Sequence, residues 1–292
     1  VLPSVIGVGE TFALRMTLFG PDGLPAQAPT RRFRLTTPNN ISGLPETIAF
    51  TDDTDGHIRI GDLIVDQPCS LIIEAHLEDR EDVGVRSNPS WVFETPPYRI
   101  FWGDLHVHTT YSNCSPWACK DPEFCYAYAR DASFLDFAAA ADHLRGIHSD
   151  ADRWPRLQEL VQAYDSPGDF VPFLGFESSH KTGYGGDINA YFLEKAAPHF
   201  WLDRDDMKGG SPAVKLEKLW QFLRASGKRF MTVPHHTGRE GKYRDFSDPV
   251  YAFEDEPLFE IYSGWGSSER YDSPYPLRGG NSQKAAYFQD AL

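Results

Sequence analysis

Short apolar segments that end in a histidine or an acidic residue recur along this 292-residue chain. Such segments are typical of β-strands, and chemistry in parallel α/β folds collects where strands run into loops. The clearest case is the stretch GDLHVHTTYS at 103–112, in which His106 and His108 lie two residues apart. Because side chains of a strand alternate between its faces, both imidazoles point the same way. One strand then offers two neutral nitrogen ligands to a divalent metal, and the fold must gather other strand ends beside it.

Three further segments repeat this arrangement. Each apolar run, at 137–141, 173–176 and 231–234, is followed at once by candidate ligands: Asp142 and His143, Glu177, and His235 and His236. A lone histidine at such a point is more often a capping or core residue. Four sets in succession predict a metal centre instead.

The candidate ligands are imidazoles and carboxylates, with no obvious thiolate. This set suits Zn²⁺, Mn²⁺ or Fe²⁺ better than a structural cysteine site would. The candidates outnumber the ligands of one ion, so we expect a centre of two or three divalent ions, with Glu177 able to bridge them. Asp142 either binds metal or orients the neighbouring His143 from behind.

Two other patterns in the sequence bear on metal binding. Four cysteines are too few and too unevenly spaced for a disulfide framework: Cys69, Cys114, Cys119 and Cys125. A zinc knuckle among the last three lacks CxxC spacing, so ordinary thiols are the simpler interpretation. A weak calcium-loop pattern near residues 51–62 is explained more simply by a hairpin turn on Asp55 and Gly56.

Residues 1–97 have a different pattern from the rest of the chain. Apparent strands at 12–19, 32–36 and 70–76 are separated by turn clusters, and no helical periodicity appears. This pattern predicts a small all-β, sandwich-like domain. A proline-rich connector ends it near residue 97.

From residue 98 to residue 292, strand-like and helix-like segments alternate. The expected strands and helices are the following: strands 100–106, 134–141, 170–176, 188–192, 230–233 and 258–262, and helices 122–130, 153–164 and 214–225. In the second helix Trp154, Leu157, Leu160 and Val161 share one face. Such alternation is typical of parallel βα units, most simply an α/β barrel that stops before its closing segment.

The order of these motifs resembles the polymerase and histidinol phosphatase (PHP) superfamily of metal-dependent hydrolases. The resemblance rests on LHVHTTYS at 105–112, ADH at 141–143, GFE at 175–177 and PHH at 234–236. The wider pattern is similar to the DUF3604 branch, which includes carbaryl-hydrolase-like enzymes. That similarity rests on FWGD at 101–104, YAYAR at 126–130 and EIYSGWGSSE at 260–269.

The resemblance covers about residues 99–292 and implies a distorted (β/α)7 barrel with up to three metal ions. It implies these ligands: His106, His108, His143, Glu177 and His235. The chain departs from the family pattern where Asn113 and Cys114 replace an expected Asp or His, and where Asp187 stands near an expected histidine. Asp187 either ligates through oxygen or leaves the third ion weakly held. A closing Asp-x-His motif is expected just beyond residue 292.

Clustered divalent ions activate water, so the sequence predicts a metal-dependent hydrolase acting on a phosphoester. Two alternatives stay open: a carboxyl-ester or aryl-carbamate hydrolase on the same site, and a catalytically weakened barrel that binds metal or ligand. His236 is the expected general acid for the leaving group. Its alternative role is a hydrogen bond to nearby backbone.

Basic residues lie in the same strand-end loops: Arg145, Lys181, Arg239, Lys242 and Arg244. They favour an anion-binding rim, with Arg145 in catalysis and Lys181 and Arg239 on the substrate. The alternative is ordinary solvated loop charge. Trp265 and Tyr262 either line an aryl pocket or pack in the core.

The formal net charge of −14 argues against duplex nucleic acid as the main partner. No apolar run approaches the length of a membrane span. We expect a small anionic or ester substrate and neither a nucleic-acid nor a membrane partner. The compartment stays open between the cytoplasm and export after removal of a signal peptide, since the first residue is valine. The oligomeric state is open as well.

Overall fold

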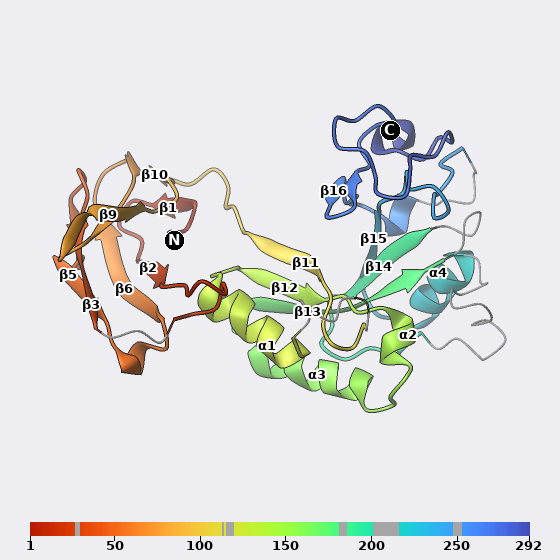
Figure 1. Ribbon diagram of the computed structural model, residues 1–292, viewed down its shortest axis with the longest axis horizontal. Helices are drawn as coiled ribbons and strands as arrows, with labels where there is room; N and C mark the ends of the chain where they lie inside the picture. Colours follow the sequence, from red (N-terminus) through yellow and green to blue (C-terminus); the bar gives the residue numbers. More distant parts are fainter. Residues whose placement is uncertain (27–29, 113, 115–119, 181–185, 201–215, 248–252) are drawn as a thin grey trace. The chain divides into compact units, whose positions relative to one another are not determined.

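The computed structural model describes residues 1–26, 30–112, 114, 120–180, 186–200, 216–247 and 253–292. The chain divides into two compact units, drawn in Figure 1. Unit 1 comprises residues 1–103 and 127–137, and unit 2 comprises residues 104–126 and 138–292. The segment 127–137, which the sequence placed in the second domain, therefore lies in unit 1.

Unit 1 contains three small sheets. In spatial order, the first sheet contains β1 (Val5–Gly7), β10 (Ser90–Phe93) and β7 (Cys69–Leu71). The second contains β2 (Phe12–Thr17), β6 (His57–Val65) and β4 (Ile41–Ser42). The third contains β5 (Thr47–Phe50), β3 (Arg31–Thr36), β8 (Glu74–Leu77) and β9 (Arg80–Arg86). The pairing is antiparallel except between β1 and β10. A short 3-10 helix, η1 (Asp52–Thr54), precedes β6.

Alternation along the strands places one apolar core inside unit 1. In β3, Phe33 and Leu35 are buried while Arg32 and Arg34 are exposed, as side-chain alternation requires. Phe33 packs edge-on against Phe50 of β5, with ring centroids 5.8 Å apart. All three sheets contribute buried residues to this core. The sequence predicted a sandwich-like domain, and the strands instead form three small sheets around that shared core.

Unit 2 is organised by one five-stranded sheet with neighbouring strands in chain order. Its strands are β11 (Gly103–Val107), β12 (Phe137–Ala140), β13 (Val171–Ser179), β14 (Asp187–Phe192) and β15 (Phe230–His235). The helical segments are α1 (Pro122–Ala127), α2 (Leu144–Ile147), α3 (Arg153–Tyr164), α4 (Leu216–Ala225), the 3-10 helix η3 (Phe253–Asp255) and α5 (Phe288–Ala291). The π-helical η2 (Tyr128–Ala132), which follows α1 directly, lies in unit 1. A two-stranded ribbon joins β16 (Tyr262–Ser263) and β17 (Gly266–Ser267).

Helix α3 covers part of this sheet, as Figure 1 shows. The apolar face predicted for residues 153–164 is confirmed, because the four residues that share it are buried: Trp154, Leu157, Leu160 and Val161. The Trp154 ring packs on Phe176 of β13 and Phe192 of β14, at centroid distances of 5.9 and 6.4 Å. These contacts anchor the strand that carries Glu177.

The predicted distorted (β/α)7 barrel is wrong. Of the described residues, 18% are helical and 35% lie in strands, and the five-stranded sheet forms only a half-barrel. Strand β14 runs antiparallel to both β13 and β15. Only residues 180–186 separate β13 from β14. That is shorter than the dozen or more residues of a parallel crossover, so these two strands form a hairpin instead of a βα unit.

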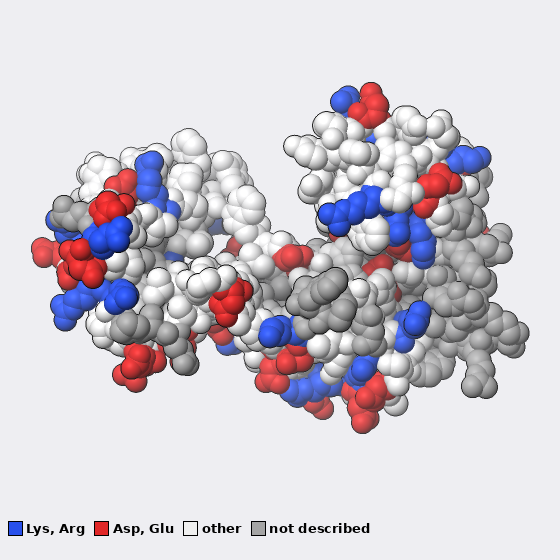
Figure 2. All heavy atoms as spheres, in the orientation of Figure 1, with Lys and Arg blue, Asp and Glu red and all other residues white. Residues whose placement is uncertain are grey.

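The helices and the charged side chains of the surface are relevant to the expected absence of membrane and nucleic-acid partners. No helix among the described residues is long and apolar enough to cross a membrane. On the face drawn in Figure 2, acidic and basic side chains intermingle on both units.

Candidate metal centre

The candidate ligands meet at one edge of the five-stranded sheet. His106 lies in β11, Glu177 in β13 and His235 at the end of β15. Asp187 begins β14, but because β14 is antiparallel, its first residue lies at the edge where its neighbours end. In the strand register, Asp187 pairs with Ser179 on one side and with His235 on the other.

The two histidines of the HxH motif point the same way, as expected from strand alternation. The Nε2 atoms of His106 and His108 lie 3.1 Å apart. The Nδ1 atom of His106 lies 2.7 Å from Oε2 of Glu260, and Nδ1 of His108 lies 2.7 Å from Oγ of Ser112. Each ring is therefore held by its Nδ1 atom, which leaves Nε2 to face the centre.

Glu177 is the centre of the cluster and is only 2% exposed. Its Oε2 atom lies 3.1 Å from Nε2 of His108, 3.1 Å from Nδ1 of His143 and 3.7 Å from Nε2 of His106. Its Oε1 atom lies 3.2 Å from Nε2 of His235. Despite these neighbours, Oε2 has no well-oriented hydrogen-bond donor among the described residues.

The close contacts between Glu177 and the histidines shift the pKa values of the groups involved. Burial alone raises the pKa of Glu177, but the imidazoles of His106, His108 and His235 outweigh it and hold that pKa well below its usual value. For His106, burial lowers the pKa, and the carboxylates of Glu177 and Glu260 overcome this and raise it to about 10. In the metal-free protein His106 is therefore a cation among carboxylates.

Two other histidines of the centre are held neutral. Burial, with the nearby His106, lowers the pKa of His235 to about 4, although Glu177 opposes the shift. Burial also lowers the pKa of His143. A neutral imidazole is the form that binds metal, so both rings carry a ligand lone pair at neutral pH.

The spacing of these atoms fits shared coordination. Metal–ligand bonds of about 2.0–2.2 Å place two ligand atoms of one tetrahedral ion roughly 3.3–3.6 Å apart. The contacts of Glu177 with its histidines, from 3.1 to 3.7 Å, bracket this range. Three groups have ligand atoms mutually within 4.8 Å: His106, Glu177 and His235; Asp187, His235 and His236; and His108, Cys114 and His143. The residues present fit a divalent metal.

Asp142 lies behind this centre. It is fully buried and accepts hydrogen bonds from the backbone N–H of Thr109 at 2.7 Å, from Thr109 Oγ1 at 2.6 Å and from Ser112 Oγ at 2.6 Å. Because the single hydroxyl proton of Ser112 goes to Asp142, Ser112 must accept from Nδ1–H of His108. Asp142 therefore fixes the tautomer of His108, whereas the sequence had linked it to His143.

Glu260 is a site residue that the ligand search by sequence missed. A parallel bridge joins it to His235, and its backbone N–H donates to the Pro234 carbonyl at 3.1 Å. Its carboxylate orients His106 through the 2.7 Å contact with Nδ1. The signal was present, since Glu260 lies in the expected strand 258–262, but no histidine accompanied it.

His236 lies beside a second carboxylate. Its Nε2 atom is 2.8 Å from Oδ2 of Asp187, and Lys242 Nζ is 3.3 Å from the other oxygen, Oδ1. His236 adopts a left-handed backbone conformation with φ of +33°, which is uncommon outside glycine. The contact with Asp187 identifies a side-chain partner for His236 in place of the backbone hydrogen bond that the sequence left open.

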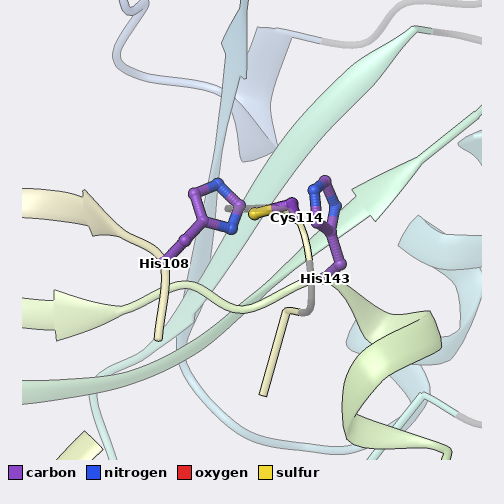
Figure 3. Close-up of side chains that lie close together, drawn as sticks. All are labelled: His108, Cys114 and His143. Carbon is purple, nitrogen blue, oxygen red and sulfur yellow. The ribbon is translucent and has the colours of Figure 1, made fainter. Parts of the chain in front are cut away.

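The third group brings Cys114 between two histidines. Figure 3 shows the sulfur of Cys114 between the rings of His108 and His143. The two ring centroids are 4.7 Å apart. Cys114 comes from the loop after β11, and His143 immediately precedes α2.

The basic residues predicted to form an anion-binding rim differ in their contacts and exposure. The guanidinium carbon of Arg239 lies 3.8 Å from the centroid of the Trp265 ring, and that ring is 6.0 Å from the His236 ring. Arg244 is fully buried and ion-paired with Glu256 at 2.6 Å, which makes it a structural residue. Arg145 is exposed on α2 and ion-pairs with none of the described residues. Lys181 lies outside the described residues.

The aromatic residues near the site are surface residues. Trp265 is 41% exposed and Tyr262 61%, so core packing does not explain them. Both belong to the segment that forms β16 and its turn into β17.

Comparisons with known proteins give one distant relative. Over 231 residues the chain is 22% identical to an uncharacterized protein of Chlamydia pneumoniae, an alignment that covers 78% of this chain and 35% of that protein. The chain thus spans about a third of the length of the curated relative it matches. No protein-family model and no solved structure matches the sequence.

Proposed function

We propose that this protein is a metal-dependent hydrolase that uses two or three divalent ions against a phosphoester. The observation that carries the proposal is the convergence of four histidine nitrogens on one buried carboxylate, Glu177. Burying that carboxylate is costly unless cationic or metal partners compensate it. Kinship with the PHP superfamily and its DUF3604 branch is part of the proposal and rests on the order of the sequence motifs.

Each group of side chains has a role in this proposal. His106, His235 and Glu177 would hold one ion, and His108 and His143, again with Glu177, would hold a second. A bound divalent ion lowers the pKa of coordinated water toward neutrality and polarises the phosphoryl group. Glu260 holds His106, and Asp142 holds His108 through Ser112, in the tautomers that present Nε2 to the centre.

The pair His236 and Asp187 supplies a proton to the leaving group. Asp187 is buried, and its pKa is lowered because the His236 contact outweighs the burial that raises it. The Asp187 carboxylate, 2.8 Å from Nε2, orients the imidazole that would act as the general acid. Together with His235, the same two residues form one of the three ligand groups, so they either donate the proton or hold a third ion.

Arg239 favours an anionic substrate. Its guanidinium stacks on Trp265, and its buried Nε has no hydrogen-bond partner among the described residues. An unpaired guanidinium donor close to His236 suits a phosphate oxygen. A second candidate, an aryl ester or carbamate, is favoured by the exposed ring of Trp265 beside the same arginine, with the exposed Tyr262 in the same segment.

Metal removal and hydrolysis assays test the proposed function. The full chain, stripped with a chelator and reloaded with Zn²⁺ or Mn²⁺, is assayed on p-nitrophenyl phosphate, an aryl acetate and an aryl carbamate. We expect turnover of the phosphate that disappears on chelation and returns with metal. Turnover of the acetate or carbamate alone replaces the phosphoesterase assignment with the second candidate. Bound metal without turnover of all three substrates supports a catalytically weakened metal-binding protein instead.

Arg239→Ala separates the two substrate classes. We expect the variant to raise KM for p-nitrophenyl phosphate about 10-fold or more, because a charge-assisted contact contributes roughly 1.5–3 kcal/mol. KM for a neutral aryl acetate should change less than about 3-fold. Arg239→Lys keeps the charge but not the planar donor, and should recover only part of the affinity. Equal losses on both substrates would contradict the anion-binding role.

A further inference from the structure

We propose that Cys114 is a thiolate ligand and that His108, Cys114, His143 and Glu177 form a zinc-selective site within the centre. The inference rests on the proposed function and adds the identity of one ion and one further ligand to the proposed metal centre. Imidazole and carboxylate alone leave zinc, manganese and iron open. A thiolate narrows this choice, because soft sulfur favours zinc over manganese.

The geometry supplies four different donors. Ligand atoms of His108, Cys114 and His143 lie mutually within 4.8 Å, and Figure 3 shows the sulfur between the two rings. Oε2 of Glu177 lies 3.1 Å from His108 Nε2 and 3.1 Å from His143 Nδ1. The group thus supplies two nitrogens and one sulfur, and the Glu177 oxygen beside both histidines would be the fourth ligand of the tetrahedral set that zinc prefers.

A second observation points to a ligand independently of the cysteine. Glu177 is 2% exposed, and Oε2 lacks a well-oriented hydrogen bond among the described residues. A buried carboxylate oxygen without a donor requires explanation in a folded protein. An ion held between Oε2, the two imidazoles and the sulfur satisfies it.

The histidine tautomer is already set for this role. Asp142 takes the hydroxyl proton of Ser112, so Ser112 accepts from Nδ1–H of His108 and leaves the Nε2 lone pair toward Glu177. Loading is a proton exchange: Zn²⁺ forms a bond to Sγ, the S–H bond breaks, and the proton leaves to solvent. No electrons are transferred.

Cobalt substitution tests the proposal without relying on activity. The metal-free full chain is titrated with Co²⁺, and its absorption spectrum is recorded. We expect a sulfur-to-cobalt charge-transfer band in the near ultraviolet together with visible bands of tetrahedral cobalt. Cys114→Ser should lose the charge-transfer band while the remaining centre still binds cobalt.

Matched cysteine variants serve as controls. Cys125→Ser on α1 and Cys69→Ser in unit 1 should keep the band, as should Cys119→Ser. If Cys114→Ser keeps the band, or if another of these variants loses it, the proposal is overturned while metal binding stands. If the wild-type protein binds cobalt with no charge-transfer band, the thiolate ligand is overturned alone. If no metal binds, both this inference and the proposed function fail.

Competition for zinc tests the selectivity. Cys114→Ser should weaken zinc binding by more than the roughly 10- to 100-fold that outer partners of a metal ligand contribute. Manganese binding should change much less. Cys114→Asp exchanges sulfur for a hard oxygen ligand and should lower the ratio of zinc to manganese affinity. An unchanged ratio in both variants would overturn zinc selection by this residue.

Discussion

Glu177→Gln is expected to release the metal from the centre and to abolish hydrolysis. The glutamine keeps the volume of the side chain but removes the negative charge that four imidazole nitrogens face within 3.1–3.7 Å. We expect metal affinity to fall by more than about 100-fold, since even residues behind a ligand contribute roughly 10- to 100-fold. Activity should fall at least as far as the roughly 100- to 1,000-fold of a lost electrostatic stabiliser. Metal titration and steady-state kinetics measure both.

Glu260→Gln is the matched control for this substitution. Among the described ligands, the carboxylate of Glu260 contacts the far nitrogen of His106, at 2.7 Å, and so acts through that ring. We expect a loss of metal affinity of about 10- to 100-fold, smaller than that of Glu177→Gln. Equal effects of the two variants, or metal binding by Glu177→Gln at the wild-type affinity, would contradict the central position of Glu177.

Asp142→Ala is expected to be the second most damaging change. It leaves three donors, two from Thr109 and one from Ser112, without their buried acceptor. Removing one partner of a buried polar network costs about 1–3 kcal/mol for each group left unsatisfied. Thermal or urea unfolding of the metal-free protein measures this cost. Once the Ser112 proton is free, His108 loses its fixed tautomer, and metal affinity should fall by roughly 10- to 100-fold.

Two milder variants separate stability from tautomer control. Thr109→Ser keeps the hydroxyl and should leave stability and metal affinity near wild type. Ser112→Ala removes the acceptor for Nδ1–H of His108 and should weaken metal binding with a smaller loss of stability than Asp142→Ala. The account of Asp142 would be wrong if Ser112→Ala bound metal as tightly as the wild type.

The candidate site was visible in the sequence because its ligands sit at strand ends. The runs before His143, Glu177 and His235 form the expected strands β12, β13 and β15, and their ends converge. Glu260 was not predicted as a site residue because it lies inside the expected strand 258–262 with no histidine beside it. Asp142 was recognised, but its true neighbours, Thr109 and Ser112, come from a different strand end, which spacing along the chain does not reveal.

The fold was harder to predict than the site. Alternating strands and helices suggested a closed parallel barrel, but periodicity does not give strand direction. The expected strands 170–176 and 188–192 are separated by residues 177–187 alone, and this short connection was the available clue to a hairpin. Asp187 lies at the sheet edge that carries the candidate ligands because β14 runs antiparallel to its neighbours. In a parallel strand, the first residue would lie at the opposite edge.

The most direct test of the account is the metal content of the purified full chain beside Glu177→Gln. Both proteins are loaded with Zn²⁺, freed of loosely bound ions by gel filtration and analysed by elemental mass spectrometry. We expect more than one equivalent of zinc per wild-type chain and the loss of most of this zinc in the variant. Circular dichroism should show that both proteins are folded. Wild-type protein without retained zinc, or a folded variant with equal zinc, would contradict a metal centre built on Glu177.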